Sequence, residues 1–176
     1  MKLSKSLYTR AIQCQKSLWL KKHNKDVLTP PNAAAQAIFQ NGNEVGDLAC
    51  KLFPNGVEIP YLNTTFQDKI NLTQEYINQG TQNIYEATFE FDGILIMIDI
   101  LNIKDNSVII NEVKSSTEVK DIYLHDASIQ YYVLNGLGYD VKKVNIIHIN
   151  NQYVRDEELD INQLFSIVDV TYEVKE

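Results

Sequence analysis

Three apolar stretches joined by two short turns constrain the fold of this chain most strongly. They are NIYEATFEF (83–91), ILIMIDILNI (94–103) and SVIINEVK (107–114). Each is rich in β-branched and aromatic residues, and the turns at Asp92-Gly93 and at residues 104–106 are long enough only to reverse the chain. We therefore predict an antiparallel meander of three strands.

Helical patterns lie on both sides of this meander. A cap at Ser4 or Ser6 starts a predicted helix that runs to about Lys22, with an apolar stripe of Leu7, Ala11, Cys14, Leu18 and Trp19. Further helices are predicted over 32–52, 64–80 and 121–138. Thr64 or Thr65 caps the helix over 64–80, and a strand over 143–150 follows the helix over 121–138. The acidic tail from 151 to 176 is expected to hold one more helix and a short strand at DVTYEV (169–174).

This order of elements predicts an α/β fold with a central mixed sheet flanked by helices. The chain has 176 residues, which suits a single domain over 1–176. A helix joins the third and fourth strands, so these two should run parallel. No glycine-rich loop follows a strand, which argues against a dinucleotide-binding fold.

Composition narrows the function classes. The chain contains no run of about 18 apolar residues and no apolar signal segment at its start, so we expect a cytoplasmic protein without a membrane partner. Its net charge is −7, yet residues 1–25 carry seven basic residues and no acid. This segment, with Lys5, Arg10 and Lys16, could meet a phosphate backbone or could simply be a solvated helix face.

An acid interrupts the apolar stripe of two neighbouring strands. Side-chain alternation groups Asp99 with Leu95, Met97 and Leu101, and groups Glu112 and Lys114 with Val108 and Ile110. A buried carboxylate needs a partner, and two carboxylates side by side favour a hard cation such as Mg²⁺ or Mn²⁺ between them. The other interpretation is a salt-bridged sheet edge in which Glu112 and Lys114 face solvent.

Five stretches in order resemble a known family. They are LSKSLYTRAIQCQKSLWL (3–20), FQNGNEVGDLACKLFPNGVEI (39–59), IYEATFEFDGILIMIDIL (84–101), NEVKSSTEVKDIYLHDASIQYYVLNGLG (111–138) and IIHINNQYV (146–154). The chain is similar to the RecB-like branch of the PD-(D/E)XK nucleases, which includes the Cas4 proteins, and most similar to the bacterial DUF2779 group. The resemblance implies a restriction-endonuclease-like fold. Relatives of this group are generally longer, so the chain could be an N-terminal part.

The resemblance also implies roles for single residues. Asp99, Glu112 and the backbone carbonyl of Val113 would bind Mg²⁺ or Mn²⁺, and Lys114 would be the catalytic lysine. Gln130 would be the glutamine of the helix motif after that lysine. Relatives usually have tyrosine four positions further on, where this chain has Leu134, and Tyr132 is then the preferred DNA contact.

Two departures from the family pattern concern metal ligands. Relatives carry a histidine in a G-x-x-H context, where this chain has Val45. Glu44 beside it, or Glu86 on the first strand of the meander, could supply an oxygen ligand instead, or each could face water. Cys14 resembles an iron–sulfur ligand of the family, but without the other three cysteines no such cluster can form within this chain, and Cys14 is expected to be a buried helix residue.

The function expected from these observations is a metal-dependent DNA nuclease, an exonuclease or end-processing enzyme acting on single-stranded or frayed DNA. The alternative is a nuclease fold that has lost catalysis and binds DNA or a partner protein.

Overall fold

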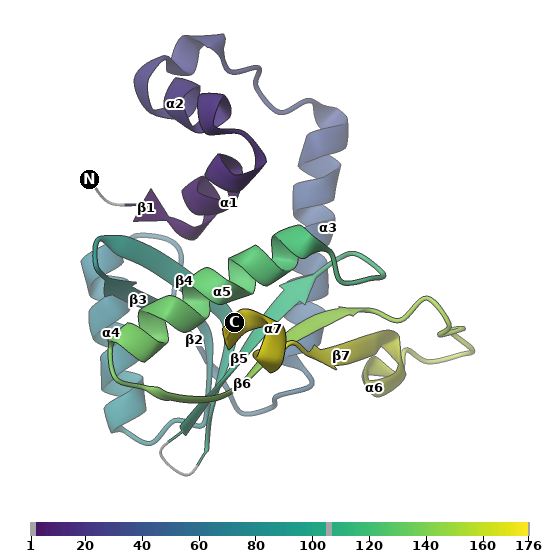
Figure 1. Ribbon diagram of the computed structural model, residues 1–176. Helices are drawn as coiled ribbons and strands as arrows, with labels where there is room; N and C mark the ends of the chain where they lie inside the picture. Colours follow the sequence, from purple (N-terminus) through teal and green to yellow (C-terminus); the bar gives the residue numbers. More distant parts are fainter. Residues whose placement is uncertain (1–2, 105–106, 176) are drawn as a thin grey trace.

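The computed structural model describes residues 3–104 and 107–175 and has the expected α/β architecture, with a mixed seven-stranded sheet flanked by helices (Figure 1). Its strands are β1 (Leu3–Ser4), β2 (Val57–Glu58), β3 (Asn83–Phe91), β4 (Ile94–Lys104), β5 (Ser107–Lys114), β6 (Asp140–Ile149) and β7 (Phe165–Asp169). Its α-helices are α1 (Lys5–Gln13), α2 (Gln15–His23), α3 (Ala33–Cys50), α4 (Phe66–Asn78), α5 (Asp121–Gly136), α6 (Ile161–Leu164) and α7 (Thr171–Lys175), and a 3₁₀ turn, η1, covers Lys25–Val27.

The predicted meander is confirmed, because β3 pairs antiparallel with β4, and β4 with β5. Asp92 and Gly93 both have positive φ, as a two-residue hairpin turn of type I′ requires. The other predicted turn includes residues 105 and 106, which lie outside the described residues. β5 and β6 run parallel, joined by α5 as expected. The full strand order is β2-β3-β4-β5-β6-β7, with β1 added on β4.

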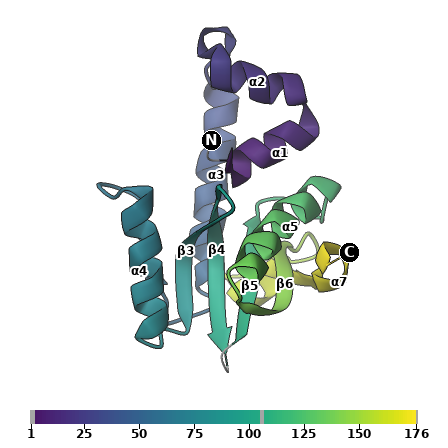
Figure 2. The ribbon, with the colours of Figure 1, turned by 60° about the vertical axis from the view of Figure 1, so that its left-hand side comes forward.

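Helices cover both faces of the sheet. One core cluster joins the sheet to α4, α5 and α7 through residues such as Leu72, Leu134 and Val174. A second cluster on the opposite face contains Val45 and Ala49 of α3. Figure 2 shows α3 running behind the strands while α5 crosses in front of them. Within the described ranges, no helix is long and apolar enough to span a membrane.

The first predicted helix differs most from its expectation. Cys14 has an extended backbone (φ −165°, ψ 107°) that divides it into α1 and α2. Cys14 is exposed rather than buried, and Trp19, expected in an apolar stripe, is 58% exposed. Every residue of both helices is at least partly exposed, because they form an arm beyond the sheet (Figure 1). The strand predicted at DVTYEV is also wrong, since β7 ends at Asp169 and the following residues form α7.

α4 shows how local sequence chemistry sets an element and its place. Thr65 and Asp68 form a reciprocal capping box at its start, and Gly80 with φ +79° follows its end. On the buried face of α4, the Thr73 hydroxyl donates to the carbonyl of Lys69 (2.9 Å) and accepts the backbone N–H of Thr88 in β3 (2.9 Å). This pair fixes α4 against β3.

Gly56 precedes β2 at a point with no room for a side chain. A Cβ there would lie 2.2 Å from Cζ of Tyr85. The Tyr85 ring is held in place because its hydroxyl donates to the carbonyls of Phe53 (2.6 Å) and Cys50 (3.3 Å). We expect Gly56→Ala to lower the free energy of unfolding by about 1–3 kcal/mol, measured by urea denaturation.

Gly42→Ala is the control for this prediction. Gly42 lies inside α3 with open space around it, so alanine there should raise the free energy of unfolding by about 0.5–1 kcal/mol. An equal effect of both substitutions would contradict the steric argument.

Candidate active site

A break in the pairing of β4 creates the place for the site. One edge of β4 pairs with β3 from Ile94 to Asn102, except at Asp99. The other edge is shared by two strands. β1 pairs with Ile94 and Leu95, whereas β5 pairs from Ile100 onward. Residues 96–99 lie between them. Lys5 directly follows β1, and Glu112 directly follows the Asn111–Ile100 pair, so both border this gap.

The strands also change face beside the gap. Ile98 and Leu101 are three residues apart, yet both belong to the same core cluster, whereas Ile100 belongs to the opposite one. On β3, Glu86 lies opposite Asp99. Its φ of 58° is unusual for a strand residue other than glycine. The expectation that Asp99 shares one continuous stripe with Leu101 is therefore wrong. The interruption leaves Glu86 and Asp99 out of the regular pairing.

Glu112 is the centre of the site. It is 2% exposed, and both of its carboxylate oxygens accept from the ammonium of Lys5 at 3.0 Å. Lys114 donates to Oε1 at 2.5 Å, and the Gln130 amide donates to Oε2 at 2.7 Å. Glu112 and Lys114, which strand alternation placed on one face, are in contact, and Gln130 of α5 joins them. The alternative of a solvent-facing sheet edge does not hold for Glu112.

Asp126 joins this group, although the sequence analysis did not single it out. Its Oδ2 accepts from Lys114 at 2.6 Å, and its Oδ1 lies 3.8 Å from the ammonium of Lys5. Asp126 and Gln130 are one helical turn apart on the buried face of α5, among apolar residues. In the sequence, the polar pair Asp126 and Gln130, four residues apart within an apolar helix stripe, is the feature that indicates a shared buried site.

Asp99 lies at the border of the same group. Its Oδ2 accepts the backbone N–H of Val113 at 2.7 Å, so the carboxylate caps β5 where the ladder with β4 has ended. Glu86 is half-buried and lies within electrostatic reach of Lys5 and Glu112. Glu86, Asp99, Glu112 and Asp126, with the two ammonium groups of Lys5 and Lys114 and the amide of Gln130, are called the carboxylate cluster below.

The cluster has more carboxylates than ammonium groups, and the pKa values reflect this. Burial and the nearby Glu112 raise the pKa of Asp99 and that of Asp126 to about 7. Burial also raises the pKa of Glu86. Burial alone would raise the pKa of Glu112 as well, but Lys114 and Lys5 outweigh it and hold this pKa below its usual range. Both lysine pKa values are raised by the carboxylates despite burial.

The other predicted site residues lie outside the cluster. Glu44 is exposed and accepts from Gln40 on its own helix, while Val45 packs in the core. Tyr132 is 45% exposed and donates to Asp92 at 3.2 Å. Lys16 is exposed on α2, and Arg10 donates to Ser17 at 2.7 Å. Lys5 was expected on the same basic surface, but the structure places its ammonium inside the cluster.

The donor set suits a hard divalent cation, but Lys5 holds the central position. Carboxylate oxygens are the ligands that Mg²⁺ and Mn²⁺ prefer, and two buried acceptors, Asp126 Oδ1 and Gln130 Oε1, have no hydrogen-bond partner among the described residues. In residues 3–104 and 107–175, however, no three His, Cys, Asp or Glu side chains are arranged to hold a metal ion. The ammonium groups of Lys5 and Lys114 lie between Glu112 and Asp126, where a cation bound by both carboxylates would lie.

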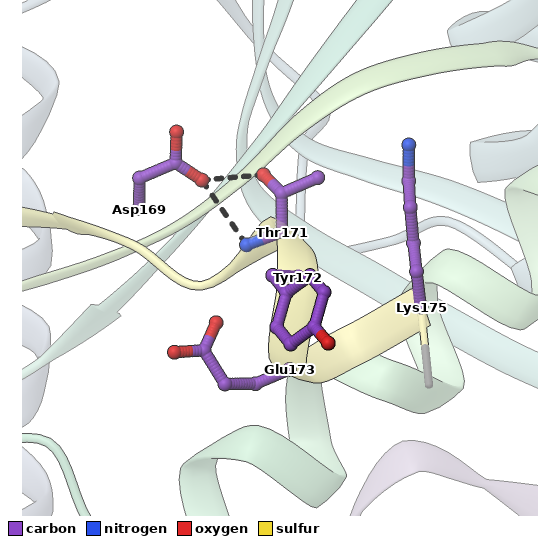
Figure 3. Close-up of a pocket in the computed structure, with 5 residues that line it drawn as sticks. All are labelled: Asp169, Thr171, Tyr172, Glu173 and Lys175. Atoms are coloured by element: carbon purple, nitrogen blue, oxygen red, sulfur yellow. Dashed lines mark hydrogen bonds between the residues drawn. The ribbon is translucent and has the colours of Figure 1, made fainter.

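A separate hollow lies at the C-terminal helix, away from these residues. It is lined by Asp169, Thr171, Tyr172, Glu173 and Lys175 (Figure 3). Asp169 accepts from the backbone N–H of Thr171 (3.1 Å) and from its hydroxyl (2.5 Å), which begins α7. These contacts serve the short helix, and the hollow shares no residue with the carboxylate cluster.

Comparison with known proteins does not identify the chain. No family model matches the chain, and no curated protein matches it. Among solved structures, the crystal structure of SSO0001 aligns with 93% of this chain and 70% of its own, at 13% sequence identity and a TM-score of 0.40. A similarity of this size assigns neither family nor function.

The raised pKa of Asp126 predicts a dependence of stability on pH. A carboxyl group whose pKa rises from 3.8 to about 7 on folding binds more protons in the folded state, so stability falls as the pH rises through that window. Asparagine cannot lose this proton. We expect Asp126→Asn to reduce the loss of unfolding free energy between pH 5 and pH 8 by about 1–3 kcal/mol.

Urea denaturation followed by circular dichroism at each pH would measure this effect. Asp156→Asn, at an exposed loop position, is the matched control and should leave the pH dependence unchanged. If the unfolding free energy of Asp126→Asn depends on pH as that of the unmodified protein does, this carboxyl group does not take up a proton on folding.

Proposed function

We propose that the chain is a metal-dependent DNA nuclease domain of the PD-(D/E)XK type, acting on single-stranded or frayed ends. The observation that carries the proposal is the meeting of Asp99, Glu112 and Lys114 at the gap beside β4, with Gln130 holding Glu112. The resemblance of the five sequence stretches to RecB-like nucleases agrees with these positions. An antiparallel meander, a crossover helix and a parallel strand, in that order, also support the assignment.

The residues of the cluster suit phosphodiester hydrolysis. Asp99, Glu112 and Asp126 would hold a Mg²⁺ or Mn²⁺ ion, which when bound supplies Lewis-acid stabilisation of the phosphate. The Lys114 ammonium is positioned by Glu112 and Asp126 and also lies 5.2 Å from the centre of the Tyr123 ring. A cation fixed in this way can orient an attacking water and stabilise the charge that develops on the phosphate oxygens. Gln130 keeps the Glu112 carboxylate in one orientation.

Cleavage of end-labelled single-stranded, blunt and frayed DNA with Mg²⁺ or Mn²⁺ would test the proposal. We expect Lys114→Met to reduce the rate by about 100-fold or more, because it removes the positioned cation. Asp99→Ala should also abolish cleavage. Lys104→Met is the control, since Lys104 is exposed at the far end of β4. Cleavage that survives in both Lys114→Met and Asp99→Ala would exclude this assignment.

A second function has its own support. The Lys5 ammonium already pairs with both oxygens of Glu112, and Val45 occupies the core position where RecB-like relatives have histidine. Both features fit a nuclease fold that binds DNA without cutting it. The exposed basic arm of α1 and α2, with Lys16, is the surface that would meet the phosphates.

Fluorescence anisotropy with labelled single-stranded DNA in EDTA would test this second function. Binding should weaken as salt rises, and Lys16→Glu should weaken it by about 3- to 10-fold and lower the salt slope by about 1. Lys104→Glu, with the same charge change outside the arm, should bind like the unmodified protein. Equal losses in both variants would mean that net charge, not the arm, controls binding.

A further inference from the structure

The ammonium of Lys5 donates to both oxygens of the Glu112 carboxylate, whereas Lys114 donates to Oε1. The Lys5 ammonium is 3.0 Å from each oxygen of that carboxylate, and 3.8 Å from Oδ1 of Asp126. The Lys5 side chain is 20% exposed and Glu112 is 2% exposed, so little water screens this pair. A single cation shared by two buried carboxylates is what a metal ion provides in a hydrolytic site.

A lysine ammonium offsets only part of the negative charge of the carboxylate cluster. It carries one charge, and together with Lys114 it pairs with Glu112 and Asp126, while Asp99 and Glu86 lie within electrostatic reach of it. Oδ1 of Asp126 has no hydrogen-bond partner among the residues that the structure describes. Glu112 and Asp126 are both buried, so little solvent screens their negative charge. A divalent ion at the same place would offset more of it.

The chain around Lys5 can release the ammonium without opening the core. Lys5 is the first residue of α1, and every residue of α1 and α2 is at least partly exposed. The short β1 pairing at Leu3 and Ser4 and the packing of α1 against α5 and β4 hold this end of the arm independently of the Lys5 ammonium. Moving one long, flexible side chain therefore disturbs few apolar contacts.

We propose that Lys5 is a tethered cation that occupies the metal position at Glu112, so that Lys5 and a divalent ion compete for the same carboxylate oxygens. The inference rests on the proposed function, because that function supplies the divalent ion as the competitor. It adds that the first residue of α1 sets the metal affinity of the site.

Isothermal titration calorimetry with Mn²⁺ in the absence of DNA would test the competition. Lys5→Met removes the ammonium and keeps an unbranched side chain, and Lys5→Gln keeps a hydrogen-bond donor for Glu112 but removes the charge. Both variants should bind Mn²⁺ at least about tenfold more tightly than the unmodified protein. Lys104→Met, with the same loss of charge elsewhere, should show no change.

Each result decides the matter. Equal or weaker Mn²⁺ affinity in both Lys5 variants would overturn the competition. If the variants unfold because the carboxylates lose their partner, Mn²⁺ should restore their circular dichroism spectrum, and failure to restore it would overturn the inference too. Tighter Mn²⁺ binding together with no DNA cleavage by any form would uphold the role of Lys5 and reject the nuclease.

Discussion

The buried carboxylate of Glu112 is the charge on which the rest of the site depends. An unpartnered carboxylate at 2% exposure would be strongly destabilising, so the fold must bring partners to it. Lys114 comes from the same strand, two residues on, whereas Lys5 of α1 and Gln130 of α5 come from distant parts of the chain. The docking of the arm, the end of the meander and the crossover helix are thus linked through one side chain.

The sheet makes room for this carboxylate by an interruption. If β5 continued to pair with β4 beyond Ile100, a backbone ladder would fill the space that Asp99 now uses to accept the N–H of Val113. β1 pairs with the remaining end of β4, so the sheet resumes on the other side of the gap. The left-handed residue Glu86 lies on the neighbouring strand at the same level. Unusual backbone at such a point agrees with a functional role for the gap.

Local chemistry was enough to predict much of the fold. The threonine cap of α4, the Asp92-Gly93 turn and the β-branched stretches of the meander act over a few residues, and the structure confirms them, with Thr65 as the cap. The apolar stripe of the first segment does not reveal the break at Cys14, because the stripe suits one buried helix, whereas every residue of α1 and α2 is at least partly exposed. β1 and β2, of two residues each, carry no periodicity that a sequence could reveal.

For the site, the spacing of residues along one strand predicted Glu112 with Lys114, and the family resemblance supplied Gln130. Lys5 and Asp126 could not be found in this way, because their positions depend on how α1 and α5 pack over the strand ends. Alternation also failed at Asp99, where the sheet changes face. The residues that sequence analysis missed are those brought in by tertiary packing.

The contact between Thr73 and Thr88 has a consequence for solubility. β3 has nine residues, but β2 pairs with it only at Ile84 and Tyr85, which leaves most of one edge open to pairing with another chain. The hydroxyl of Thr73 takes up the N–H of Thr88 in the middle of that edge, and α4 packs beside it. The Thr73 hydroxyl therefore satisfies one backbone donor of this edge, and the packing of α4 against β3 leaves less of the edge free to pair with another chain.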